Sequence, residues 1–366
     1  MRNSVSILFF LFITSMNITG QNSVESLPVA GDLSIEVKNV SFIKNNEYYN
    51  PVVEGYTLIG YFLQPELIYS PSERFSLGIG THVLHYAGAP DFSTFKPVLS
   101  ATYYIAGNSS FTIGSLNGSD KHEMADPHFN RERFYTTYSE EGLQLTFLTD
   151  HLFSDTWLSW ENFIFKGDTT REIFSFGESF KYSSSLINEV FFFEIPLQLQ
   201  FKHYGGQISN YPEPVETFLN LATGAAIKAD IRAEKYGTAG IECLLFISKE
   251  LSVHSTTGVS SGNAEWFRLN YSYKNLQLEA GYWTAHDFFA PDGNPIFGSV
   301  SDYDENVVIP DRKIITGGIN LALRPESYLQ LYIGAEAYWD INLNRIDSSV
   351  TLHLSFDKLF RITKIK

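Results

Sequence analysis

The sequence predicts an all-β protein, an antiparallel up-and-down β-barrel of about 16 strands that crosses a membrane. The first observation is the alternation in residues 188–204, NEVFFFEIPLQLQFKHY. The odd-numbered residues from Phe191 to Phe201 are apolar, and those between them from Glu194 to Lys202 are polar except Pro196. Side chains on a strand point alternately to opposite faces, so one face is apolar and the other polar. The apolar row has about the length that a tilted strand needs to cross a bilayer.

The second observation is the composition. The chain of 366 residues has 15% aromatic and 18% charged residues, and a formal net charge of −15. Alternating strands give such a balance because half of each strand is polar. The acidic charge argues against a nucleic-acid partner, which needs a basic surface. The single cysteine, Cys243, cannot form an internal disulfide bond.

The N-terminus is predicted to be a signal peptide covering residues 1–20, which leaves one barrel domain over residues 21–366. Arg2 precedes an apolar stretch at residues 5–13, and small and polar residues follow it up to Gly20. The apolar stretch is too short to span a membrane as a helix. The segment therefore predicts export.

The predicted strands are segments in which apolar residues recur at every second position between turn residues. In the first half of the chain Leu33, Ile35 and Val37 begin such a row, and Phe174 and Phe176 belong to another. Glu178 continues this second row, and a charged residue at this place is explained only by an interfacial position or a bulge. The segments of this half are residues 33–45, 55–70, 75–87, 95–106, 111–116, 141–149, 155–165 and 172–182.

The second half continues the pattern. Leu329, Leu331 and Ile333 are in phase, as are Val350 and Leu352. The segments of this half are residues 188–204, 218–232, 236–248, 266–273, 276–282, 313–323, 328–339 and 349–356. Between residues 249 and 263 the pattern is weak, and residues 357–366 are expected to form a tail after the last strand.

The third observation is that short and long breaks tend to alternate along the chain. Short breaks lie at residues 71–74, 107–110, 150–154 and 183–187, and longer ones at 46–54, 88–94, 117–139, 167–171 and 205–216. This asymmetry is typical of short periplasmic turns and longer outer loops. A soluble β-sandwich has no reason to maintain it.

On these grounds the chain resembles the outer-membrane β-barrel proteins of Gram-negative bacteria in the broad, porin-like sense. The last predicted strand, VTLHLSF at residues 350–356, resembles the aromatic-terminated strand that the barrel assembly machinery recognises in such proteins. Residues 142–177 resemble uncharacterised barrels of the Bacteroidota. The resemblance implies location in the outer membrane, with membrane lipid and lipopolysaccharide as neighbours.

Charged residues in the polar rows are predicted to line the barrel lumen, because a lipid face would not tolerate them. They could form the wall of a pore that selects solutes by charge and size, or a set of ion pairs that only braces the barrel. These candidates are Glu161, Glu194, Lys202, Glu242, Arg268, Glu279, Glu336 and His353.

The long loop at residues 117–139 is a candidate constriction of the lumen, since long loops are often functional. Its candidate residues are Asp120, His122, Glu123, Asp126 and His128. Their spacing matches no zinc motif, so a solvated polar loop is the simpler interpretation, and no metal site is predicted. The carboxylates at residues 302–305 are likewise interpreted as solvated surface rather than a calcium loop.

Two further patterns point to other functions. His254, Ser255 and Thr256 suggest a hydrolase, but adjacent side chains on a strand face opposite ways, and no catalytic residues are predicted. Trp266 and Trp283 fall in polar rows and could stack on sugars, although interfacial or core packing is the stronger interpretation.

The predicted function is a porin-like channel for small polar solutes, with saccharides as candidates, acting without a cofactor and without enzymatic activity. Two alternatives remain open: a barrel-embedded enzyme that acts on lipid or lipopolysaccharide, and a secreted β-rich adhesin or lectin.

Overall fold

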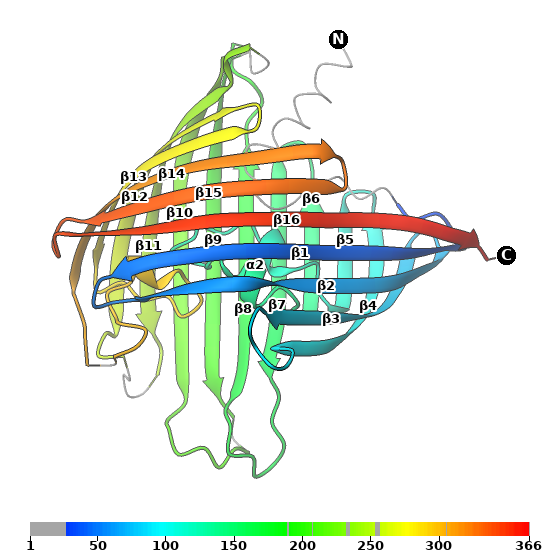
Figure 1. Cartoon of the computed structure of the whole chain (residues 1–366), viewed down its shortest axis with the longest axis horizontal. Coiled ribbons are helices and arrows are strands. Elements are labelled where there is room, and N and C mark those ends of the chain that lie inside the picture. Colours follow the sequence, from blue (N-terminus) through cyan, green and yellow to red (C-terminus); the bar gives the residue numbers. More distant parts are fainter. Residues whose placement is uncertain are drawn as a thin grey trace.

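In the computed structural model the chain forms a closed barrel of antiparallel strands, which confirms the predicted fold class. The structure describes residues 27–365 except 189, 207, 232–234, 253–256 and 305, so the predicted signal peptide lies outside the described residues. Sixteen strands follow one another around the barrel in sequence order, and β1 closes it by pairing with β16. Figure 1 shows β16 and β1 crossing in front of β7, β8 and β9 on the opposite wall.

Most of the strands are long enough to cross a membrane with tilt. In the first half of the chain they are β1 Asp32–Tyr49, β2 Glu54–Ser72, β3 Phe75–Tyr86, β4 Thr94–Ala106, β5 Ser109–Ser115, β6 Glu141–Leu148, β7 Leu152–Asn162 and β8 Glu172–Ser183. In the second half they are β9 Phe191–Gly205, β10 Glu216–Asp230, β11 Thr238–Glu250, β12 Ser261–Tyr273, β13 Leu276–His286, β14 Asp311–Glu326, β15 Leu329–Asp340 and β16 Arg345–Lys364.

The two ends of the barrel differ in their connections. At one end most strands are joined by tight turns, such as those between β2 and β3 and between β12 and β13. The opposite end carries the long connections β5–β6 and β13–β14. Long loops mark the outer side of such barrels, so this second end is the outer rim.

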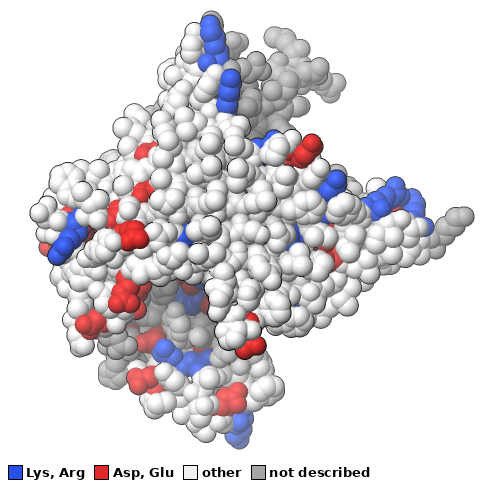
Figure 2. All heavy atoms as spheres, viewed as in Figure 1, with Lys and Arg blue, Asp and Glu red and all other residues white. Residues whose placement is uncertain are grey.

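Side chains alternate between the lumen and the lipid face as the sequence predicts. On β9, Glu194 and Lys202 point inward and are buried, whereas Ile195 and Leu197 point outward and are 44% and 47% exposed. Figure 2 shows that the wall around β15, β16 and β1 is largely uncharged on its outer surface. An apolar outer band is what a barrel presents to hydrocarbon. Among the described residues, no helix has the length and apolar character to span a membrane.

The lumen is filled in its outer half, a point that the sequence left open. Residues 116–140, which contain the short helices η1 (Ser119–Lys121) and α2 (Arg133–Thr136), fold inward, as do residues 287–310, which contain η3 (Pro295–Phe297). We call these two loops together the plug. Figure 1 shows α2 enclosed by the strands.

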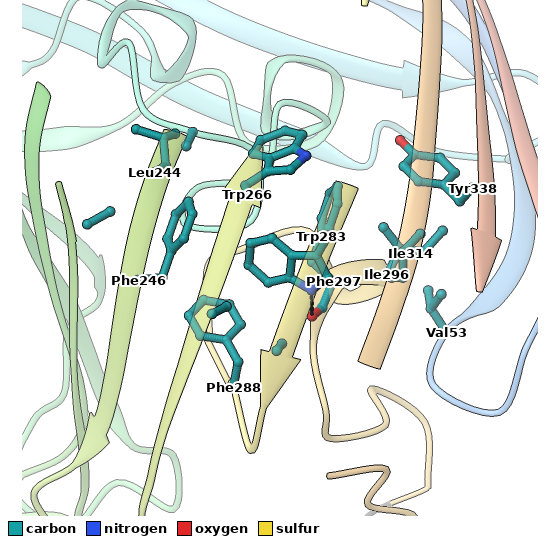
Figure 3. Close-up of a cluster of buried hydrophobic side chains, with 14 of the residues drawn as sticks. Val53, Leu244, Phe246, Trp266, Trp283, Phe288, Ile296, Phe297, Ile314 and Tyr338 are labelled. Carbon is teal, nitrogen blue, oxygen red and sulfur yellow. Dashed lines mark hydrogen bonds between the residues drawn. The ribbon is translucent and has the colours of Figure 1, made fainter. Parts of the chain in front are cut away.

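Apolar packing holds the plug against the wall. Phe288, Ile296 and Phe297 of the second loop pack against Trp266 and Trp283, which point into the lumen from β12 and β13 (Figure 3). Both tryptophans are almost completely buried, so core packing accounts for them, in agreement with the stronger of the two sequence interpretations. A second cluster joins the first loop to β1, β2 and β3 and comprises Phe134, Tyr135, Tyr138, Val40, Phe42, Phe62 and Leu84.

The largest differences from the predicted strand boundaries are at the start of β12 and at the end of β16. β12 begins at Ser261, and its early outward residues Asn263 and Glu265 are polar, so the apolar alternation does not mark them as strand. β16 runs on to Lys364 in register with β1, so most of the expected tail belongs to the barrel wall. An ion pair between Arg361 and Asp32, at 2.6 Å, supports this extension.

Candidate functional site

A cavity lies on each side of the plug. The outer one has a volume of about 780 Å³ and lies between the plug and loop residues such as Arg171 and Tyr211. The inner one has a volume of about 270 Å³ and is lined by charged residues of the inner half of the wall. Asn130, Glu132 and Asn294 of the plug line both cavities, so the plug lies between them.

His122 of the first plug loop lies between two carboxylates. It is fully buried, and its Nδ1 lies 2.8 Å from Asp155 Oδ2 while its Nε2 lies 2.7 Å from Glu140 Oε2. Burial opposes protonation, but the two carboxylates outweigh it and raise the pKa of His122 to about 9. The imidazole stacks on Trp157 at 3.6 Å between ring centroids.

The surroundings explain why His122 is held so firmly. Trp157 in turn lies over Gly177, where an added Cβ would come within 2.1 Å of the indole ring. A histidine with both nitrogens bonded to carboxylates is a doubly protonated cation and cannot act as a general base. His122 therefore forms a structural ion pair that fixes the plug to β7.

Asp292 is the anchor of the second plug loop. It is buried, and its Oδ1 lies 3.0 Å from Arg133 Nη1 and 2.9 Å from Lys202 Nζ. Gln200 donates to its other oxygen at 2.6 Å. Burial favours the neutral acid, but Lys202 and Arg133 outweigh it and hold the pKa of Asp292 below its usual value. Lys202 also pairs with Glu161 at 2.5 Å.

The predicted lumen residues all point inward, and ion pairs connect most of them. Glu161 and Lys202 lie beside the plug and form an ion pair. His353 Nδ1 forms a hydrogen bond with the Tyr135 hydroxyl at 2.7 Å. The other five belong to the inner cavity. There Lys228 pairs with Glu194 at 2.6 Å, Arg131 with Glu336 at 3.2 Å, and Arg268 with both Glu242 and Glu279.

The predicted constriction loop does enter the lumen, and its residues have separate partners. Asp120 lies 3.3 Å from Lys121, Glu123 lies 2.6 Å from Lys181, and Asp126 accepts from Asn294 at 2.8 Å. His128 is fully buried, and its ring lies near the backbone of Asn220 and the side chain of Gln198. Burial lowers the pKa of His128 to about 4, so it is neutral at physiological pH.

Metal ligation finds no support in this arrangement. Within the described part of the chain no group of three or more His, Cys, Asp or Glu side chains is placed to hold a metal ion. Asp302 lies in the second plug loop, where burial raises its pKa to about 6. His254, Ser255, Thr256 and Glu305 lie outside the described residues.

Polar groups also interrupt the outer, lipid-facing wall. Near the outer rim, His203 Nδ1 on β9 lies 2.9 Å from Thr217 Oγ1 on β10. Lower on the same sector, Glu178 on β8 accepts hydrogen bonds from Ser154 at 2.8 Å and from Thr156. This bonding accounts for the carboxylate that breaks the apolar row of β8.

A third outward group lies at the rim between β1 and β2. Asn45 Nδ2 donates to Glu47 Oε1 at 2.8 Å, Tyr49 donates to the other oxygen of Glu47 at 2.5 Å, and Thr57 donates to Asn45 at 2.5 Å. All three clusters face away from the lumen, where a membrane lipid can reach them.

These outward groups and the anchors of the plug are not among the residues predicted from the sequence. His203 continues the apolar row of β9, and Thr217 precedes Leu219 and Leu221 in the row of β10. A polar residue ending an apolar row on two consecutive strands was therefore an available signal. Arg133 and Asp292 carried no such signal because they lie 159 residues apart, and the contacts of Glu140 with His122 and Arg133 depend on how the loop folds.

Solved structures of outer-membrane barrels share this fold. OccK2 (OpdF) of Pseudomonas aeruginosa, in complex with glucuronate, has a TM-score of 0.54 at 10% identity, covering 92% of this chain and 100% of that one. The anion-selective porin of Comamonas acidovorans has a TM-score of 0.53 at 8% identity, covering 89% and 100%. OmpTdeltaL8, a loop L8 deletion mutant of OmpT of Vibrio cholerae, has a TM-score of 0.51 at 10% identity, covering 90% and 100%. These likenesses show the fold, which is that of an outer-membrane barrel.

A comparison with curated proteins finds no match. A family model described as "Lipid A 3'-O-deacylase-type" matches residues 22–365. That description refers to an enzyme, so the prediction that the chain has no enzymatic activity is corrected. Because the match extends over nearly the whole sequence, the chain belongs to the lipid A 3'-O-deacylase-type family.

Proposed function

We propose that this protein is an outer-membrane enzyme that removes an acyl chain, by ester hydrolysis, from an acylated glycolipid of the lipid A type. The family description supplies the reaction class. The observation that carries the proposal is the filled lumen. Trp266, Trp283 and Phe297 close the outer half with packed side chains, so a lipid meets the outer wall and not the interior.

The chemistry requires certain groups at the level of the lipid head groups. Ester hydrolysis uses a nucleophile or an activated water, a base to take its proton, and donors for the developing oxyanion. The acyl ester of a glycolipid lies just inside the leaflet surface, because its chains are in the hydrocarbon and its sugars are in the aqueous layer. The polar clusters at the outer rim lie at this level.

The test is release of fatty acid. Purified protein is inserted into vesicles of phosphatidylcholine containing lipid A, and the lipid is analysed by mass spectrometry. The proposal expects a lipid A species that has lost one acyl chain, together with the free hydroxy or fatty acid. An unchanged lipid A spectrum with correctly folded protein contradicts the proposal.

A second candidate is passage of small polar solutes, including saccharides, through the barrel. The inner cavity favours it, because Arg268, Glu242 and Glu279 give it the charged lining of a selective pore. The porin and the glucuronate complex among the structural neighbours belong to barrels of this kind. Passage requires the plug to move, since its loops separate the two cavities. Conductance of the wild-type protein in planar bilayers, with and without glucuronate, tests this candidate.

A further inference from the structure

In the described part of the outer half of the wall, His203 contacts a hydroxyl group, that of Thr217. His203 Nδ1 lies 2.9 Å from Thr217 Oγ1, and the two residues face each other directly across β9 and β10. Both are partly exposed and point away from the lumen. Among the described residues, the other outward histidines near this rim differ. His286 pairs with Asp311 and Asp287, and His85 packs against Tyr61 and Phe92.

The surroundings of the pair fix its geometry. The ring of His203 packs against Phe174 at 4.9 Å between centroids, and Phe174 stacks on Trp160 at 5.1 Å. The backbone N–H of Thr217 donates to Ser252 Oγ at 2.9 Å. Gly205 leaves room beside the imidazole, because an added Cβ there would come within 2.9 Å of His203 Nε2. Hydrogen-bonded neighbours and close packing keep a nucleophile and a base at reacting distance.

The position of the pair suits a lipid with an anionic head group. Toward the membrane centre the outward rows continue with Phe201 and Leu199 on β9 and with Leu219 on β10, a surface along which an acyl chain can lie. Lys249 on β11 faces the same way, is exposed and pairs with Leu219, two positions from Thr217. A cation at this level attracts phosphate groups at the leaflet surface.

We propose that His203 and Thr217 form the ester-cleaving site on the outer wall, with an acyl ester of an anionic glycolipid as substrate. This inference rests on the proposed function and gives it a location. The Thr217 hydroxyl donates to Nδ1 when the neutral imidazole carries its proton on Nε2. This is the arrangement in which a base can take the proton of a nucleophile.

The reaction proceeds in two balanced steps. Thr217 Oγ attacks the ester carbonyl carbon while its proton passes to His203 Nδ1. The C–O bond of the ester then breaks, the sugar oxygen takes the proton from His203, and the acyl group stays on Thr217. In the second step His203 removes a proton from water, the resulting hydroxide attacks the acyl carbonyl, and the proton returns to Thr217 Oγ as the fatty acid leaves.

The experiment measures fatty-acid release from phosphatidylcholine vesicles containing lipid A by the full-length protein and its variants. T217A and H203N are expected to lose at least about 100-fold in rate, the size of a general-base contribution. T217S, which keeps the hydroxyl, is expected to retain activity. Two matched controls are expected to behave as wild type: T223A, an outward threonine of β10 that donates to the Pro196 carbonyl, and H286N, the exposed histidine of β13.

A second measurement separates failure of the site from failure of the function. The folded proteins are treated with a fluorophosphonate probe and the labelled residue is identified by peptide mass spectrometry. Labelling of Thr217 that depends on His203 supports the site even when lipid A is not cleaved, and then only the proposed substrate is wrong. Release by T217A or H203N at the wild-type rate overturns the site and leaves the function standing. If the wild type shows no fatty-acid release and no labelling, both the site and the proposed function are overturned.

Discussion

Arg133 Nη1 lies 3.0 Å from Asp292 Oδ1, and this ion pair joins the two loops that fill the barrel. Arg133 opens α2 in the first loop, and Asp292 lies in the second loop, 159 residues further along the chain. Asp292 also bonds to Lys202 and Gln200 of β9. One carboxylate thus connects both halves of the plug to the wall.

We predict that D292A loosens the plug. The variant removes the carboxylate that pairs with the buried cations Arg133 and Lys202. Breaking a buried ion pair in this way typically lowers the free energy of unfolding by about 3–5 kcal/mol. The expected result is higher single-channel conductance in planar bilayers and faster proteolysis of the loops at the outer rim. D304A, in the same loop, is the control and should behave as wild type, because among the described residues the Asp304 carboxylate accepts hydrogen bonds from Asn306 and has no cation beside it. Equal conductance of D292A and D304A would show that the ion pair does not hold the plug.

The ion pairs of His122 predict an unusual pH dependence of stability. Its pKa in the folded protein, about 9, exceeds the ordinary value of 6.5. The folded state therefore binds the proton more tightly, so the stabilisation is complete below about pH 6.5 and is lost as the pH rises through about 9. A shift of this size corresponds to roughly 3 kcal/mol.

Urea unfolding in detergent, followed by the gel shift between folded and unfolded barrel, measures this effect. The wild type should lose stability between neutral pH and pH 9–10, and H122N should be less stable at neutral pH and show a flatter profile. H151N, a partly exposed histidine at the inner rim, is the control. An H122N profile parallel to that of the wild type would rule out this role for His122.

Burial of His128 is expected to make the stability of the protein fall at acid pH. Burial lowers its pKa to about 4 from 6.5, so the unfolded state binds the proton more tightly. The stability is full above about pH 6.5 and is lost as the pH falls through about 4. H128F replaces the imidazole by an apolar ring beside Phe246 and should unfold less readily than wild type near pH 4–5. The same acid midpoint in both proteins would contradict this assignment.

Glu178 gives a prediction for the lipid face. A carboxylate in the apolar band is unfavourable even when Ser154 and Thr156 donate to it. E178L should therefore be neutral or stabilising by about 1 kcal/mol in urea unfolding. Clear destabilisation by E178L, with E178Q unchanged, would show that the hydrogen bonds outweigh the cost of the charge.

The strand pattern was predictable because each strand of a barrel alternates between two uniform environments. The rows containing Leu197, Leu331 and Leu352 all face outward, as their alternation requires. The extension of β16 to Lys364 was not predictable from alternation alone, since it depends on pairing with β1 near Asp32.

The site was less predictable than the fold. The alternation of apolar and polar residues predicts that Glu242 and Arg268 point inward. The plug, in contrast, depends on contacts between loops that are distant in sequence, such as that of Arg133 with Asp292. Trp266 and Trp283 in polar rows were the available sign of a filled lumen. The pairing of His203 with Thr217 required the register between β9 and β10, which no local pattern gives.

The most direct test of the account is mass spectrometry of lipid A in vesicles after incubation with wild type, T217A and the double variant R268Q/E279Q. The account predicts loss of an acyl chain with wild type and with R268Q/E279Q, and none with T217A, because the reaction takes place on the outer wall. Loss of the reaction in R268Q/E279Q together with full activity of T217A would contradict it and place the chemistry in the lumen.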